Sequence, residues 1–282
     1  MQNELPDQSV LYIYADGPKE NASEDQLKQI QKVRQLIRTK QWCKDVFIIE
    51  RENNLGLANS IINGVTEILN KHDKVIVLED DIVASKGFLK YMNEALCLYE
   101  KEDRVGCIHA WNYKMDTSGY PESTFFLKGA DCWGWATWKR SWSLFNPDGG
   151  FLLESILSKN MQYEFDRRGT HNYEIMLRDQ TEGKNDSWAI RWHASLFLQN
   201  KYCLQPARPI VKNIGFDNSG IHCNDTDMVQ NPVDYININK IDVTESEWFL
   251  KAYNNYLAAN NKATVVTKWQ KSKTFLRHLY RR

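Results

Sequence analysis

The stretch Val-Ile-Val-Leu-Glu-Asp-Asp, residues 75–81, carries the strongest structural signal of this 282-residue chain. Its apolar half predicts a strand buried on both faces, which is typical of a parallel sheet in an α/β domain. Ligands of such sheets gather at the carboxyl ends of the strands, where three acids repel one another unless a cation joins them. Oxygen ligands suit Mg²⁺ or Mn²⁺, so a divalent ion carrying a diphosphate is one interpretation. A solvated acidic turn is the other.

The segments around residues 75–81 alternate between strand and helix. Further strands are predicted at Val10–Ala15, Val46–Ile49 and Val105–Ala110. Helices are predicted at 24–40 with Ser23 as N-cap, at 57–70, at 85–99 and, in two pieces, at 172–199. Such alternation with short links is the signature of a parallel sheet flanked by helices. Residues 205–232 are predicted to be irregular.

The amino-acid composition limits the expected binding partners and the cellular compartment. The chain has 36 basic and 36 acidic residues, so no net field favours nucleic acid. Its six cysteines show no CxxC pair and no short ligand spacing, which indicates free thiols in a reducing compartment. Because the chain shows neither a signal-peptide pattern nor an apolar run of bilayer length, we expect a soluble, cytoplasmic protein.

The last twenty residues, 263–282, contain six Lys or Arg and no acid. Val265, Trp269, Leu276 and Tyr280 fall near one face of a helix. An interfacial helix on an anionic membrane is one interpretation, and a helix packed on the domain with a solvated basic face is the other. Liposome binding with and without residues 263–282 separates the two.

Six short segments follow one another along the chain: Asp16 after the first strand, Glu79-Asp80-Asp81, Trp111-Asn112, Cys132–Trp138, Asn185–Trp188 and Gly215–His222. This ordered series resembles bacterial family 2-type glycosyltransferases with the GT-A fold. It is also distantly similar to eukaryotic N-acetylglucosaminyltransferase I, whose acidic triplet is likewise Glu-Asp-Asp. The resemblance covers roughly residues 10–225. It implies an α/β, Rossmann-like domain with a mostly parallel sheet flanked by helices.

The resemblance also implies a division of the chain. Residues 1–235 form the GT-A-like domain, with a nucleotide-sugar half at about 1–115 and an acceptor half at about 116–235. Residues 236–282 form a C-terminal helical extension. One departure is the start: the family normally opens with a strand and a helix that hold part of the nucleotide base, and here nine residues precede the first strand. Either the chain is a fragment or the base pocket is built differently.

The resemblance assigns the acidic triplet to a nucleotide-sugar donor and its metal ion. Asp81 matches the ligand of Mn²⁺ or Mg²⁺, Asp80 a contact to the ribose or metal region, and Glu79 a contact to donor sugar hydroxyls. One protein carboxylate with phosphates and waters suffices for such ions. His222, on a later loop, is a candidate metal or phosphate contact, because neutral imidazole is a common ligand.

Two residues near the first strand are candidate donor contacts. Asp16 matches the acid that accepts the uracil N–H, which favours a UDP-linked donor; a plain turn residue is the alternative. Asn54 precedes a helix and could face the donor, whereas helix capping explains it as well.

The acceptor side needs a general base. Asp186 is the first candidate, because the resemblance places an acid just before a Trp there, and Asp179 is the second. The alternative for Asp186 is N-cap of the helix that starts at Trp188. Aromatic faces stack on sugar rings, so the Gly-containing stretch offers three candidate platform residues for donor or acceptor, with at least one expected in the core: Trp133, Trp135 and Trp138.

Together these features predict an inverting, metal-dependent glycosyltransferase acting on a glycan or glycolipid acceptor in polysaccharide or glycolipid assembly. Inversion is implied by the resemblance. A non-catalytic carbohydrate-binding relative is the alternative. A nucleotidyltransferase is less favoured. It would be expected to carry a Gly-rich phosphate loop with a basic residue near the first strand, and the sequence shows none there.

Overall fold

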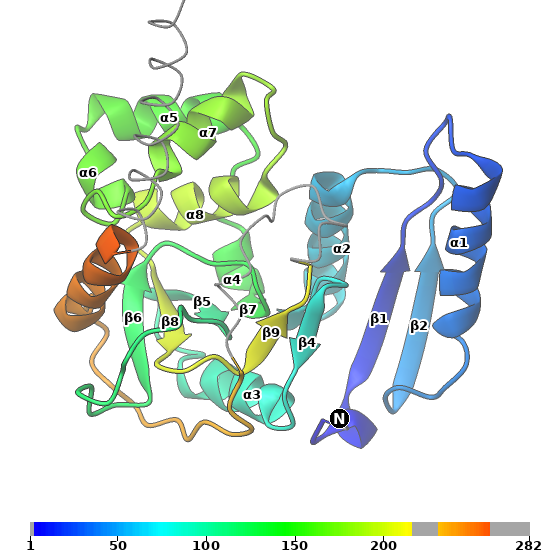
Figure 1. The fold of residues 1–282 in the computed structure, drawn as a ribbon, viewed down its shortest axis with the longest axis horizontal. Helices are drawn as coiled ribbons and strands as arrows, with labels where there is room; N and C mark the ends of the chain where they lie inside the picture. Colours follow the sequence, from blue (N-terminus) through cyan, green and yellow to red (C-terminus); the bar gives the residue numbers. More distant parts are fainter. Residues whose placement is uncertain (1–2, 216–230, 260–282) are drawn as a thin grey trace, which may run out of the picture.

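The computed structural model describes residues 3–215 and 231–259, and shows an α/β architecture (Figure 1). His222 and the basic segment 263–282 lie outside the described residues, so their predicted roles are not tested. The main sheet has five strands in the order β3 (Lys74–Val77), β7 (Trp135–Trp138), β5 (Val105–His109), β8 (Tyr202–Pro206) and β6 (Thr124–Lys128). A second, two-stranded ladder joins β4 (Ile82–Ala84) to β9 (Val211–Asn213).

The main sheet is mixed, so the prediction of a mostly parallel sheet is wrong. Only β5 and β8 pair in parallel, whereas the pairs β3–β7, β5–β7 and β6–β8 are antiparallel. Parallel neighbours need a long crossover, usually a helix, and antiparallel neighbours do not. No helix lies between β6 and β7. Two of the strands, β8 and β9, fall inside or beside the segment predicted to be irregular.

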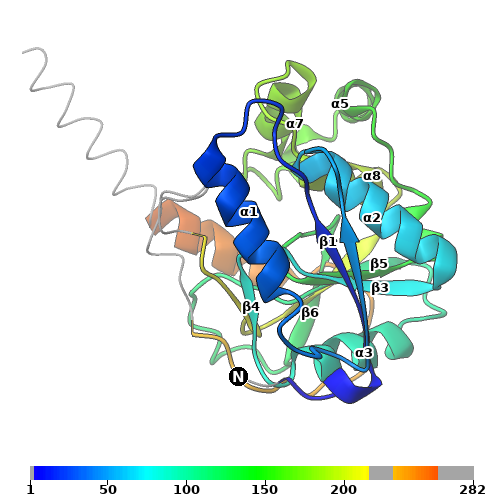
Figure 2. The ribbon, with the colours of Figure 1, turned by 90° about the vertical axis from the view of Figure 1, so that its right-hand side faces the viewer.

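Helices cover the sheet from both sides (Figures 1 and 2). They are α2 (Leu57–Lys71), α3 (Phe88–Leu98), α4 (Lys139–Trp142), α5 (Gly149–Ser158), α6 (Gln162–Phe165), α7 (Tyr173–Thr181) and α8 (Trp188–Leu198). The break between α7 and α8 confirms the prediction of two helices within 172–199. Asn185 braces this break, since its side chain accepts from the Ser187 N–H and donates to the Met176 carbonyl.

The first fifty residues form a small lobe of their own. A 3₁₀ turn, η1 (Pro6–Gln8), leads into β1 (Val10–Ala15), which pairs in parallel with β2 (Asp45–Glu50); α1 (Glu24–Leu36) lies on the outer side of the pair (Figure 2). Ser23 caps α1 in a capping box with Gln26, as predicted. The pair β1–β2 is not hydrogen-bonded to the main sheet.

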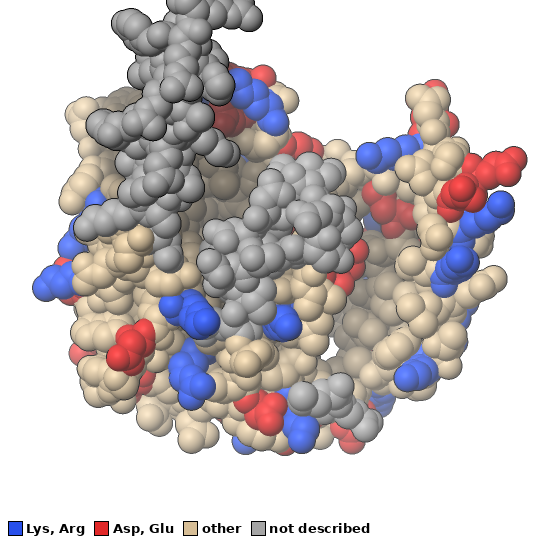
Figure 3. All heavy atoms as spheres, in the orientation of Figure 1, with Lys and Arg blue, Asp and Glu red and all other residues tan. Residues whose placement is uncertain are grey.

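Contacts between this lobe and the rest run through aromatic side chains of β1 and through the N-terminal residues Asn3 and Glu4. The Tyr12 hydroxyl lies 3.0 Å from His72 Nε2, and the Tyr14 ring lies against Gly64 of α2. No residue of α1 is buried, and Val33, Leu36 and Phe47 are each more than half exposed. The space-filling view shows a hollow between the lobe and the body, with acidic side chains on its walls (Figure 3).

The core is rich in tryptophan and extends past residue 235. Trp135 and Trp138 are 0% and 3% exposed. Residues 247–259 are helical, and Phe249 stacks on Phe125 of β6 at 3.4 Å between ring centroids. The boundary predicted at residue 235 therefore falls inside one packed unit. Within residues 3–215 and 231–259, no helix has both the length and the apolar composition needed to cross a bilayer.

Candidate active site

The acidic triplet lies in the turn that links β3 to β4. The Ile82 N–H donates to the Glu79 carbonyl at 3.1 Å and closes the turn. As strand alternation predicts, Asp80 is exposed, whereas Glu79 and Asp81 are half-buried. The Asp81 carbonyl accepts from the Ile214 N–H at 2.8 Å, which ties the triplet to the end of β9.

Close packing holds the Asp81 side chain in place. A Cβ on Gly215 would stand 2.6 Å from Asp81 Oδ2, so a larger residue at this position would displace the carboxylate. Asn213 donates a side-chain hydrogen bond to Asp81. The triplet therefore sits where the carboxyl end of β3 meets the end of β9, as the sequence placed it.

Burial and mutual repulsion oppose ionisation of the triplet. The pKa of Glu79 is raised to about 7, chiefly by burial and then by the charges of Asp81 and Asp80. A hydrogen bond from the Trp188 side chain lowers it only in part. The pKa of Asp81 is raised too, first by burial and then by Asp80. Among residues 3–215 and 231–259, no cation pairs with these carboxylates.

The residues fit a divalent ion bound mainly through its ligand. Asp81 Oδ1 is buried and has no hydrogen-bond partner among the described residues. An orphaned carboxylate oxygen is costly unless something binds it, and hard cations prefer such oxygens. Residues 3–215 and 231–259 contain no group of three or more His, Cys, Asp or Glu side chains placed for a metal. Phosphate oxygens and water would therefore supply most of the coordination.

Asp16 and Asn54 connect the first strand to the start of α2. The Asp16 carboxylate accepts from the backbone N–H groups of Leu55 (2.9 Å), Gly56 (3.2 Å) and Gly17 (3.0 Å). The Asn54 side chain donates to the Gly17 carbonyl at 3.1 Å. Gly56, the N-cap residue of α2, has no side chain that can cap the helix. The Asp16 carboxylate, just after β1, instead accepts hydrogen bonds from backbone N–H groups at the start of α2. Both residues have a structural role in the turn, and their contact with a nucleotide stays a prediction.

Asp186 lies two positions before Trp188, whose side chain donates a hydrogen bond to Glu79 of the triplet. Ser187, not Asp186, caps α8: its hydroxyl accepts from the Ile190 N–H. The capping alternative for Asp186 is thereby removed. Asp186 Oδ1 instead pairs with Arg191 Nη2 at 3.0 Å, and its side chain is 68% exposed. Asp186 is thus ion-paired through Oδ1 and otherwise open to solvent.

Asp179, the second candidate base, lies at the C-terminal end of α7. Lys184 Nζ contacts Asp179 Oδ1 at 3.1 Å and also pairs with Glu182. These contacts fold the α7–α8 loop on itself. Within residues 3–215 and 231–259, neither Asp179 nor Asp186 forms a hydrogen bond or ion pair with the triplet, but Asp186 lies two positions from Trp188, which donates to Glu79.

The three candidate platform tryptophans separate into two classes. Trp135 and Trp138 are core residues of β7, and their burial overturns the prediction that they contact a sugar. The Trp135 ring packs against the Trp188 ring at 5.3 Å between centroids, so it helps to position Trp188, which hydrogen-bonds Glu79. Trp133 is half-buried and stands edge-on to Trp111 at 4.6 Å. Of the three, it alone is not fully buried.

The structure adds a second polar centre that sequence reasoning missed. Asp131, in the loop between β6 and β7, meets Arg167, His109 and Gln205. Its only sequence signal is its place directly before Cys132 in the motif segment. Arg167 lies in a turn of no regular pattern, about 36 positions further along, so spacing could not pair the two.

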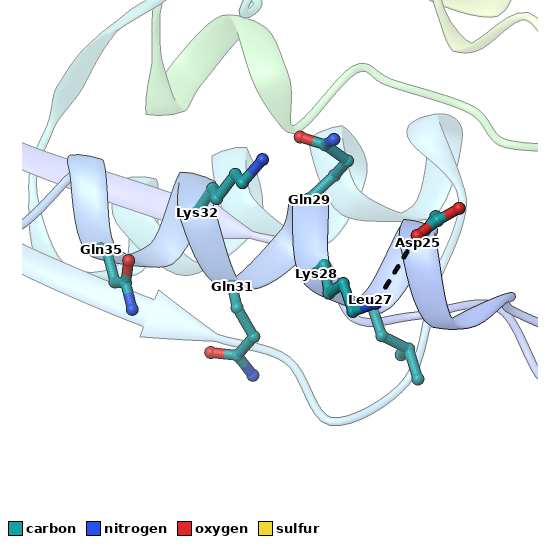
Figure 4. Close-up of a pocket in the computed structure, with 7 residues that line it drawn as sticks. All are labelled: Asp25, Leu27, Lys28, Gln29, Gln31, Lys32 and Gln35. Carbon is teal, nitrogen blue, oxygen red and sulfur yellow. Dashed lines mark ion pairs between the residues drawn. The ribbon is translucent and has the colours of Figure 1, made fainter.

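Surface hollows elsewhere do not compete with this site. One of about 420 Å³ lies along α1, and its lining side chains are polar except for Leu27 (Figure 4). Asp25 and Lys28 form the ion pair there, at 3.8 Å. None of the triplet, Asp131 or Asp186 lines it.

Comparison of the chain with protein-family models and with curated proteins finds no match.

Proposed function

We propose that this protein is a metal-dependent glycosyltransferase of the GT-A type that moves a sugar from a nucleotide-sugar, UDP-linked by preference, to an acceptor hydroxyl. One observation carries the proposal. Three carboxylates at the end of β3 have no cationic partner in the described chain, and Asp81 Oδ1 is buried without a hydrogen bond. A divalent ion on a diphosphate supplies the missing charge.

The chain's own residues suit a direct displacement. The acceptor oxygen forms a bond to the anomeric carbon while the bond from that carbon to the phosphate oxygen breaks. The electron pair leaves with the nucleoside diphosphate, and Asp186 takes the acceptor's proton. When bound, a divalent ion would stabilise the charge that grows on the diphosphate. Displacement with one base inverts the anomeric carbon, which is the expected outcome.

Donor placement falls to the triplet and its neighbours. Asp81 would hold the ion, Asp80 would face the ribose region, and Glu79 would bind hydroxyls of the donor sugar. A Glu79 with its pKa near 7 can donate as well as accept a hydrogen bond, which suits a sugar hydroxyl. We further propose a glycan or glycolipid acceptor in polysaccharide assembly and a cytoplasmic location, with residues 263–282 as a membrane contact.

Calorimetric titration tests the proposal. The full chain is titrated with UDP, UDP-GlcNAc, UDP-galactose and GDP-mannose, each with and without Mn²⁺. We expect one nucleotide series to bind only with Mn²⁺, and Asp81→Ala to lose that binding. The matched control is Asp148→Asn, which changes an exposed helix-capping carboxylate outside the triplet. Absence of any binding, or Mn²⁺-independent binding unaltered in Asp81→Ala, would overturn the assignment.

One observation favours a second candidate, a carbohydrate-binding protein without donor chemistry. The pair β1–β2, which carries Asp16, is not continuous with the sheet that carries the triplet. A base pocket spanning both would depend on contacts of Tyr12 and Tyr14 with α2. Glycan binding that is independent of Mn²⁺ and nucleotide would favour this candidate.

A further inference from the structure

The start of α8 packs against the end of β3, where the acidic triplet lies. Trp188, the first residue of α8, is 3% exposed and stacks on Trp135 of β7, with 5.3 Å between ring centroids and 30° between the ring planes. Trp135 pairs in register with Val77, the last residue of β3, and both pack in the same apolar cluster as Trp188. Paired residues of an antiparallel ladder share a face, and Glu79 lies two positions beyond Val77 on that face. The geometry of the sheet therefore places the Trp188 ring beside Glu79.

The indole of Trp188 uses its nitrogen on the triplet. Its N–H donates a hydrogen bond to the Glu79 carboxyl. The ring nitrogens of Trp135 and Trp192, in the same cluster, are buried with no hydrogen-bond partner among residues 3–215 and 231–259. No ion pair of these residues reaches Glu79, so the hydrogen bond from Trp188 gives its carboxyl a fixed direction. An indole nitrogen only donates, so it fits a carboxylate oxygen and no cation.

The segment that holds Trp188 also holds the proposed base. Asp186 and Ser187 directly precede it, and the Ser187 hydroxyl caps α8 by accepting from the Ile190 N–H at 3.2 Å. Asp186 pairs with Arg191 of the same helix at 3.0 Å, and Arg191 also donates to the Pro147 carbonyl at 3.3 Å. The first turn of α8 is thus fixed at several points, and its stack on β7 sets where it stands relative to the triplet.

We propose that Trp188 is a positioning residue for the donor sugar: its N–H, held in place by the stack on Trp135, orients the Glu79 carboxyl toward the sugar hydroxyls of the nucleotide-sugar. This inference rests on the proposed function, which assigns Glu79 to the donor sugar and Asp81 to the ion on the diphosphate. Trp188 should therefore affect binding of the sugar and leave binding of the diphosphate unchanged. A tryptophan that only packs would affect both alike.

The test is calorimetry on the full chain with Mn²⁺, using the nucleotide-sugar and the matching nucleoside diphosphate that wild type binds. Trp188→Phe keeps an aromatic ring on Trp135 and removes the N–H. Benzothienylalanine at position 188 replaces the N–H by sulfur at nearly the same shape, and so protects the fold. In both we expect Kd for the nucleotide-sugar to rise roughly three- to tenfold, the loss of one hydrogen bond, with Kd for the nucleoside diphosphate unchanged.

A double-mutant cycle shows whether Trp188 acts through Glu79. In the Glu79→Ala background, Trp188→Phe should have no further effect on Kd for the nucleotide-sugar, because the carboxyl that it orients is gone. The matched control is Trp142→Phe, in the same cluster as Trp188. The Trp142 N–H donates to the Thr66 hydroxyl at 2.9 Å, away from the triplet. We expect this control to lower the unfolding temperature and leave both Kd values unchanged.

Three results would overturn the role of Trp188. They are an unaltered Kd for the nucleotide-sugar in both position-188 variants, an equal rise in Kd for the two ligands, and a full effect of Trp188→Phe that persists in Glu79→Ala. Failure of wild type to bind any nucleotide would instead defeat the proposed function.

Discussion

Two carboxylate centres lie side by side at one end of the sheet and behave in opposite ways. Glu79 and Asp81 are half-buried and pair with no cation of the described residues, and their pKa values are raised. Asp131 is half-buried beside Arg167, and its pKa is lowered. Burial alone raises the pKa of any carboxyl, so the sign of the net change reports whether the protein brought its own counter-charge. Within residues 3–215 and 231–259 the first centre has no paired cation, whereas Arg167 supplies one to the second.

The largest expected effect breaks the first centre. Asp81→Ala removes the carboxylate oxygen that has no partner in the described chain, and should abolish Mn²⁺-dependent nucleotide binding in calorimetry. Asp131→Glu should keep that binding, because its centre does not use the ion. Equal loss in both variants would erase the distinction between the two centres.

The next effect concerns stability. Arg167→Met leaves Asp131 as an uncompensated buried charge and should lower the free energy of unfolding by about 3–5 kcal/mol, measured by urea denaturation at pH 7. Glu79→Gln, which removes a charge that repels its neighbours, should leave stability unchanged or slightly raised without metal. A smaller loss in Arg167→Met than in Glu79→Gln would contradict this account.

The third effect separates donor binding from turnover. Asp186→Asn should cut the release of nucleoside diphosphate by about 10²-fold or more, the usual range for loss of a general base, with nucleotide affinity retained. Asp179→Asn serves as the comparison, with near-normal turnover expected. Normal turnover in Asp186→Asn would move the role to Asp179.

The smallest expected effect is the pH dependence of stability, which has opposite signs for Glu79 and Asp131. The folded-state pKa of Glu79, about 7, exceeds its unfolded value near 4.5, so the native carboxyl stays protonated up to a higher pH than the unfolded one. Metal-free stability should therefore fall as pH rises from about 4.5 to 7, by on the order of 1–2 kcal/mol, and Glu79→Gln should flatten that fall. The lowered pKa of Asp131 acts in the other direction: its stabilisation is present above the unfolded pKa and is lost as pH falls below about 4. Urea denaturation between pH 3 and 8 measures both windows.

Local patterns predicted the helices and the place of the triplet well. Apolar spacing gave α2 and α8 within about two residues, and Ser23 caps α1 in a capping box. Boundaries were less exact at α3, which starts at Phe88 rather than at residue 85. Strand direction was not predictable, because the apolar run of a buried strand is the same for parallel and antiparallel neighbours.

The tryptophans show the limit of what can be predicted from local sequence. Trp133 and Trp135 are two positions apart, yet Trp133 is half-buried and Trp135 is fully buried against Trp188. Similarly, nothing near Asp186 in sequence distinguishes a cap from a base. The structure removes the capping role, because Ser187 caps α8 and Asp186 is exposed.

Sequence alone was sufficient for what depends on near neighbours: the alternation of strands and helices, the Ser23 cap, and an acidic turn at the end of β3 with Asp80 on the face opposite Glu79 and Asp81. Tertiary structure was needed for the mixed sheet, the buried tryptophans and the pairing of Asp131 with Arg167. The physical reason is range. Propensity and periodicity act over a few residues, whereas the charge state of a carboxylate is set by groups that the fold brings within 4 Å from distant positions.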